Sequence, residues 1–161
     1  MKWLKAGAVG ALAALVMLVI IQILIAAGIA PFQQAPSAAF LDRMGIPPLP
    51  LALLVHFGYG IVWSILFVAA FQNADKLLGK GLGLGVVLWL IMMLVASPMI
   101  GWGIFGIADT SNLPEALQLG SPAKYIIATL VLHLIYGGIV GWANPAWLKL
   151  DHRAAAPKTS A

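Results

Sequence analysis

Four long apolar stretches, separated by shorter polar segments, dominate the hydrophobic pattern of this chain. A helix of about 20 mainly apolar residues crosses a bilayer, and each stretch reaches that length. None alternates with the period of two that membrane barrel strands require, so helices are expected. The pattern predicts an all-α protein with a single integral membrane domain, spans at residues 6–30, 49–71, 79–104 and 123–147, two long loops at 31–48 and 105–122, and a tail at 148–161.

The composition excludes an ordinary water-soluble domain. Hydrophobic residues make up 62% of the chain and charged residues 9%. Soluble domains contain about 45–50% apolar and about 25% charged residues. We therefore expect the lipid bilayer as the main partner.

Charge and cysteine usage exclude further classes. The net charge is only +4, and the basic residues lie at segment ends rather than in one patch. This distribution argues against nucleic acid as a partner. The absence of cysteine excludes disulfides, thiol nucleophiles and thiolate metal sites.

The distribution of Lys and Arg predicts the orientation. Only Arg43 and Lys124 lie near the two long loops, whereas the termini and the 72–80 connection hold Lys2, Lys5, Lys76, Lys80, Lys149, Arg153 and Lys158. Segments rich in Lys and Arg stay on the cytoplasmic side of a membrane. Both termini are therefore expected in the cytoplasm, the tail at 148–161 is cytoplasmic, and the two long loops are outer loops. Trp102 is expected near the outer membrane interface.

The two halves of the chain share a pattern, which predicts an internal repeat. The second span carries His56, Tyr59, Gly60 and Ser64, and the fourth span carries His133, Tyr136, Gly137 and Gly141 at the same spacing. A shift of 75 residues places Gly10 on Gly85 and Pro47 on Pro122, whereas the His-Tyr-Gly pair needs a shift of 77. The predicted fold is therefore a four-transmembrane-helix antiparallel bundle built from two tandem helical-hairpin repeats.

The repeated residues share one face of each helix, because positions i, i+3, i+4 and i+8 lie close together. Small residues four apart allow close backbone approach. The predicted helix-packing positions are therefore Gly60, Ser64, Gly137 and Gly141. Histidine and tyrosine avoid lipid and are expected to face the bundle interior. At a rise of about 1.5 Å per residue, they fall at a similar depth to polar residues of spans one and three. The predicted intramembrane polar layer consists of Gln22, His56, Tyr59, Ser97, His133 and Tyr136.

Three roles for this layer stay open from the sequence. The first is structural: a small non-enzymatic membrane protein that packs with itself or with a larger membrane partner through spans two and four. The second is a b-type haem-binding or electron-transfer subunit, because neutral imidazole binds haem iron and His56 and His133 are candidate axial ligands. The third is a small transporter or channel subunit, because ionisable residues inside membranes often mark pathways.

The structural role is the main prediction, and no catalytic residue is assigned. The chain lacks a phosphate loop, a dinucleotide glycine fingerprint, Gly-x-Ser-x-Gly and His-Glu-x-x-His.

Helix-breaking and capping residues predict further detail. Ser37 is expected to cap a short helix at 38–44, with Gly45 as its stop. A second short helix is expected between Pro114 and Gly120. Pro98 is expected to kink the third span, and the dipeptide at 144–145 (Asn-Pro) to end the fourth.

The His-x-x-Tyr-Gly pattern on the second and fourth of four spans resembles the YagU-like family of small bacterial inner-membrane proteins. The Gly-Ile-Pro-Pro segment at residues 45–48, which leads into the second span, adds to the resemblance. The resemblance implies a four-span fold and a location in the bacterial cytoplasmic membrane. It implies no functional residues, because that family has no settled biochemical activity.

Overall fold

Long helices account for almost the whole architecture in the computed structural model, which describes residues 1–71, 73–74 and 76–148. The four longest helical segments are α1 (Lys2–Ala26), α3 (Leu51–Phe71), α4 (Leu77–Ile91) with its continuation to Ile100, and α6 (Pro122–Leu148). Each is long and apolar enough to cross a membrane. The described residues contain no β-strand. The prediction of an all-α protein with four candidate membrane spans is therefore confirmed.

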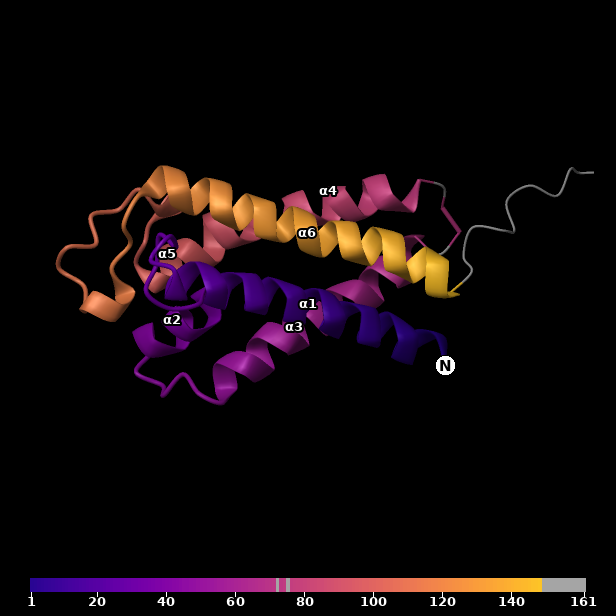
Figure 1. The fold of residues 1–161 in the computed structure, drawn as a ribbon, viewed down its shortest axis with the longest axis horizontal. Coiled ribbons are helices and arrows are strands. Elements are labelled where there is room, and N and C mark those ends of the chain that lie inside the picture. Colours follow the sequence, from indigo (N-terminus) through magenta and orange to yellow (C-terminus); the bar gives the residue numbers. More distant parts are fainter. Residues whose placement is uncertain (72, 75, 149–161) are drawn as a thin grey trace, which may run out of the picture.

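The four helices pack as two pairs. α1 packs against α3, α4 packs against α6, and α1 and α6 join the two pairs. α3 barely contacts α4 or α6, so the two pairs touch along one side only. Figure 1 shows the pair α1–α3 below the pair α4–α6, with the N-terminus and the end of α6 at the same end. The chain therefore crosses from end to end an even number of times.

The first and third spans differ in their bounds from the predicted ones. α1 begins earlier than the predicted 6–30, at Lys2. It also ends earlier, because the chain turns at Gly28, whose φ of 68° is left-handed. The third segment covers residues 77–100 rather than 79–104, and it ends at Gly101, which has a φ of 100°. The residues left over at both places belong to the connections between helices.

A π-helical turn, η1 (Met92–Ala96), separates α4 from α5 (Ser97–Ile100). Pro98 has no N–H, and its ring crowds the carbonyl of Leu94, four residues earlier. A wider turn accommodates the ring, and such turns are a known cause of irregularity in long helices. The irregularity that Pro98 was expected to cause in the third span is therefore a π-helical turn.

Asn144 and Pro145 do not end the fourth span, contrary to the prediction, because α6 continues to Leu148. Asn144 is fully buried, and its Nδ2 donates to the carbonyl of Val140 and to the hydroxyl of Ser64, each at 3.1 Å. Proline is tolerated in a membrane helix where nearby side chains and helices satisfy the polar groups around it. The rest of the predicted tail, residues 149–161 with three of its basic residues, lies outside the described residues.

The first long loop contains α2 (Pro36–Arg43). Its N-cap is Ala35, which makes no side-chain capping bond, so the predicted cap Ser37 is wrong. Pro36 starts the helix instead, because its fixed φ suits the first turn. Gly45, with a φ of 72°, follows the helix and confirms the predicted stop. The helix predicted at 114–120 is wrong in extent, because only a 3-10 turn, η3 (Glu115–Leu117), forms there.

Residues 27–50 and 101–121, here called the cap, pack on each other at one end of the long helices (Figure 1). The cap also contains the short 3-10 turn η2 (Ile104–Gly106). Trp102 is fully buried within it, and its Nε1 donates to the carbonyl of Leu117 at 2.7 Å. Phe32 stacks on Trp102 with 6.3 Å between ring centroids, and the Gly120 N–H donates to the Pro31 carbonyl at 2.7 Å. Trp102 is therefore a core residue of the cap, and its predicted position near the outer membrane interface stays a prediction.

Candidate functional site

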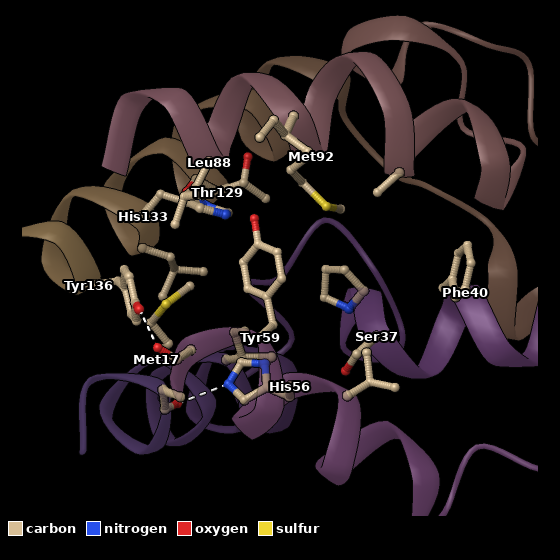
Figure 2. Close-up of a pocket in the computed structure, with 18 residues that line it drawn as sticks. Met17, Ser37, Phe40, His56, Tyr59, Leu88, Met92, Thr129, His133 and Tyr136 are labelled. Carbon is tan, nitrogen blue, oxygen red and sulfur yellow. Dashed lines mark hydrogen bonds between the residues drawn. The ribbon is translucent and has the colours of Figure 1, made fainter. Parts of the chain in front are cut away.

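A cavity of about 270 Å³ lies between the pair α1–α3 and the pair α4–α6 (Figure 2). Most of its lining is apolar and comes from all four long helical segments, together with α2 and η1. Ligand sites are mainly apolar cavities of about 300–1,000 Å³ with a few well-placed polar groups, and the volume of this cavity is slightly below that range. Its polar lining side chains are Ser37, His56, Tyr59, Thr129, His133 and Tyr136.

The His and Tyr residues of both repeated motifs line this cavity, but two of them are hydrogen-bonded between helices. His56 Nε2 lies 2.9 Å from the carbonyl oxygen of Ala14 and links α3 to α1. A carbonyl oxygen only accepts, so this ring nitrogen carries the proton and donates. The Tyr136 hydroxyl donates to the Gly60 carbonyl at 2.5 Å and links α6 to α3. These two side chains therefore hold helices together.

The other two members, Tyr59 and His133, direct polar atoms into the cavity (Figure 2). His133 Nδ1 donates to the carbonyl of Thr129 at 2.7 Å, one turn earlier on the same helix. This bond orients the ring without linking two helices. Tyr59 extends from α3 across the cavity toward the side of His133 and Met92, and its ring packs edge-on to Trp63 at 6.0 Å.

The two motifs therefore have complementary roles. The first supplies the helix-linking histidine and the cavity tyrosine, whereas the second supplies the helix-linking tyrosine and the cavity histidine. A repeated pattern in the sequence predicts equal roles, but the two histidines here meet different carbonyl groups. His56 and Tyr136 therefore link helices, whereas the polar atoms of Tyr59 and His133 face the cavity.

Gln22 and Ser97, the other members of the predicted polar layer, do not line the cavity. Gln22 is exposed on the surface of α1, one residue after the buried Ile21. Ser97 is fully buried, but its hydroxyl donates to the carbonyl of Gly103 at 2.7 Å, within the connection that follows α5. The structure thus brings together four of the six predicted residues and places the other two elsewhere.

Gly60 and Ser64 lie where α3 crosses α1 at close range. A Cβ atom added at Gly60 would stand 2.8 Å from the Cβ of Ala14, a distance that real side chains do not adopt. One turn further along α3, the Ser64 hydroxyl donates to the Ala6 carbonyl at 2.7 Å. Close approach and a hydrogen bond therefore act together at this crossing.

Gly137 and Gly141 lie at the corresponding crossing of α6 with α4. A Cβ atom at Gly137 would collide with the carbonyl oxygen of Gly81, and one at Gly141 would stand 2.6 Å from the carbonyl oxygen of Leu77. All four predicted packing positions are buried within this chain. They pack the helices of this chain against one another, and the predicted packing of spans two and four with a second copy or a larger partner stays a prediction.

Several residues of the site were not predicted from the sequence. Ser37 and Phe40 line the cavity from α2, and Met92 and Ala96 line it from the π turn. Thr129 lies four residues before His133, a spacing that places it on the same helix face and was available as a signal. The contributions of α2 and the π turn carried no signal, because they depend on how the cap folds back over the helices.

The hydrogen bonds of the two histidines do not favour the predicted ligation of haem iron by His56 and His133. Two axial histidines need a free ring nitrogen each, aimed at one iron atom. His56 Nε2 already donates to Ala14, so ligation through that atom would break a bond between two helices. Tyr59 also crosses the cavity between α3 and the side of His133 (Figure 2). The arrangement gives the haem prediction no geometric support.

Comparison with known families places almost the whole chain in one of them. Residues 1–149 match a family described as a family of unknown function, DUF6789. No curated protein and no solved structure matches the chain. The resemblance to the YagU-like family stays a prediction, because the match is to a different family description.

Proposed function

We propose, for a chain that belongs to the DUF6789 family of unknown function, a non-enzymatic role as a small integral membrane protein that binds an apolar molecule inside the bilayer. The observation that carries this proposal is the cavity of about 270 Å³ between the two helix pairs, with Tyr59 and His133 directed into it. An apolar cavity with a few convergent polar groups is the usual form of a small-molecule site.

The hydrogen-bond pattern supports binding over a purely structural role. Polar side chains inside a membrane protein are costly and are normally engaged with one another or with backbone. His56 and Tyr136 meet that expectation through bonds between helices. His133 bonds only to its own helix, so helix packing does not explain why an imidazole faces this cavity.

The proposal also assigns an orientation and a location, in the bacterial cytoplasmic membrane. Lys5 lies over the ring of Trp147, with 5.6 Å from its Nζ to the ring centroid, so the start of α1 and the end of α6 share one end. Lys80 lies over Phe71 at 5.1 Å, near the start of α4. Basic residues gathered at this end favour the cytoplasmic side for it, and the cap then faces outward.

The binding proposal is tested by identifying molecules that copurify with the protein. The protein is purified in mild detergent and extracted with organic solvent, and the extract is compared by mass spectrometry with that of Ala96→Phe, which fills the cavity from the π turn. Ala69→Phe, on the exposed surface of α3, is the matched control. We expect one species to be retained by the wild type and by Ala69→Phe and to fall at least fivefold in Ala96→Phe. Identical extracts from all three proteins would overturn the proposal.

A further inference from the structure

The polar groups of the cavity differ in whether they still offer a hydrogen-bond donor. Thr129 donates its hydroxyl proton to the Tyr125 carbonyl at 2.6 Å, and Tyr136 donates to Gly60. His56 and His133 each donate one ring N–H to a backbone carbonyl. Four of the six polar lining side chains therefore have their donors engaged by backbone, and only the hydroxyls of Ser37 and Tyr59 remain for a ligand.

The hydrogen bond from His133 to Thr129 determines whether the other ring nitrogen of His133 is a donor or an acceptor. A neutral imidazole carries one N–H, and in His133 that N–H is on Nδ1 because its partner is a carbonyl oxygen. Nε2 is therefore an acceptor, as it is on any neutral imidazole that donates through Nδ1. Among the described residues, none donates a hydrogen bond to this atom. A bound molecule needs a donor group to satisfy it.

The absence of charged residues among the described lining residues further restricts the chemical class of the ligand. No Asp, Glu, Lys or Arg is among the described residues that line the cavity. A charged donor such as an ammonium group would be buried there without a counter-ion, at a cost of several kcal/mol or more. A hydroxyl group donates one hydrogen bond, accepts another and carries no charge. It matches both the acceptor on His133 and the rotatable hydroxyl of Tyr59.

The open side of the cavity indicates where the ligand comes from. Three lining residues remain well exposed, with Val55 at 41%, Tyr59 at 41% and Ile91 at 37%. They lie on α3 and α4, the two helices that barely contact each other. α2 lines the cavity from the side of the cap. In a protein that spans the bilayer, the face between α3 and α4 meets lipid chains.

We infer that the ligand is a lipid-soluble alcohol or phenol whose hydroxyl donates to His133 Nε2 and accepts from the Tyr59 hydroxyl, with its apolar remainder extending between α3 and α4 into the bilayer. This inference rests on the proposed binding function and names the chemical class of its ligand. It excludes ketones, esters and ethers as good ligands, since these groups only accept hydrogen bonds.

The test compares two probes that differ only in the donor, 4-hexylphenol and its methyl ether, 4-hexylanisole. Their binding to the detergent-solubilised protein is measured by isothermal titration calorimetry. Titration of Ala96→Phe measures partition into the micelle and is subtracted. We expect the wild type to bind the phenol about tenfold more tightly than the ether, the factor expected for one buried hydrogen bond. His133→Leu should reduce this preference to less than about threefold. Tyr59→Phe should instead weaken the binding of both probes and keep the preference, because the oxygen of either probe accepts from the Tyr59 hydroxyl.

The outcomes separate this inference from the proposed function. Equal affinity of the wild type for the phenol and the ether would overturn the donor requirement and leave the binding function standing. Binding of neither probe by a protein whose extract does contain a cavity-dependent molecule would overturn the ligand class. His133→Leu is expected to fold, because its only hydrogen bond is within α6. Tyr59→Phe provides a second variant, and loss of the preference for the phenol in that variant would contradict the assignment of the ligand's donor contact to His133.

Discussion

At the scale of single residues, the same side-chain type has different roles in the two halves of this protein. Tyr136 is buried, and its hydroxyl donates to a backbone carbonyl of another helix, whereas Tyr59 is exposed at the edge of the cavity. Likewise, His56 is hydrogen-bonded to another helix, whereas His133 is hydrogen-bonded only to its own helix and faces the cavity. A hydrogen bond between helices contributes to stability, whereas under the proposed function a group that faces the cavity contributes to binding.

Tyr136→Phe tests this difference directly. The substitution keeps the ring and removes only the hydroxyl, so the Gly60 carbonyl loses its donor from α6. We expect the free energy of unfolding to fall by about 0.6–1.7 kcal/mol, which runs from the average to the largest value measured for hydrogen bonds between membrane helices. Tyr59→Phe, the matched control, should change it by less than about 0.5 kcal/mol. Reversible unfolding in mixed micelles measures both, and an equal loss in the two variants would contradict the assigned roles.

At the scale of helices, glycine determines how closely α4 and α6 approach. Gly81, Gly137 and Gly141 place backbone against backbone at the crossing, with no room for a Cβ atom. Van der Waals contact of this kind drives helix association in lipid, where burial of apolar surface gives no advantage. The two adjacent glycines on α6 differ sharply in this respect, since a Cβ at Gly138 would meet only a Leu82 methyl group at 3.8 Å.

Gly137→Ala and Gly138→Ala therefore form a matched pair. Both substitutions raise helix propensity by about the same amount, up to about 1 kcal/mol. Gly137→Ala forces the backbones of α4 and α6 apart. We expect a net loss of stability of about 1–3 kcal/mol from this overpacking. Gly138→Ala should be neutral or stabilising. The midpoint of thermal unfolding, followed by circular dichroism in detergent, measures both. The close approach would be disproved by a Gly137→Ala protein as stable as the wild type.

At the scale of the whole molecule, the two helix pairs meet along α1 and α6 and leave α3 and α4 apart. The cap ties the far ends together through Trp102, Phe32 and the bond from Gly120 to Pro31. The cavity lies between the pairs because only one side of each pair is in contact with the other. Both ends of the described chain lie opposite the cap (Figure 1).

The proposed orientation predicts the outcome of reporter fusions in bacteria. Alkaline phosphatase, which is active only outside the cytoplasm, should be inactive when fused after Ala161. The same enzyme inserted after Asn112, an exposed residue of the cap, should be active. Green fluorescent protein fused after Ala161 should fluoresce. The positive-inside distribution of Lys and Arg is the reason for these expectations. Active phosphatase after Ala161 together with an inactive insertion after Asn112 would reverse the orientation.

The hydrophobic pattern alone was enough to establish the four helical spans, because a chain with this much apolar surface and so little charge has to satisfy its backbone internally in lipid. The spacing of the repeated motifs also predicted that Gly60 and Gly137 lie where helices approach closely, since small residues four apart share a helix face. Where a local rule fails, a tertiary contact is responsible. α6 passes through Pro145 because Asn144 is buried against Ser64, and Trp102 is buried in the cap because Leu117 offers its carbonyl.

The roles of the repeated His and Tyr residues, in contrast, depend on contacts between helices. Both motifs have the same spacing, and spacing determines a helix face but not the partner that the face meets. His56 lies beside a carbonyl group of α1, so it links helices, whereas His133 reaches only a carbonyl of its own helix and faces the cavity. The cavity itself depends on α2, the π turn and the separation of α3 from α4, which arise from contacts between segments far apart in the chain.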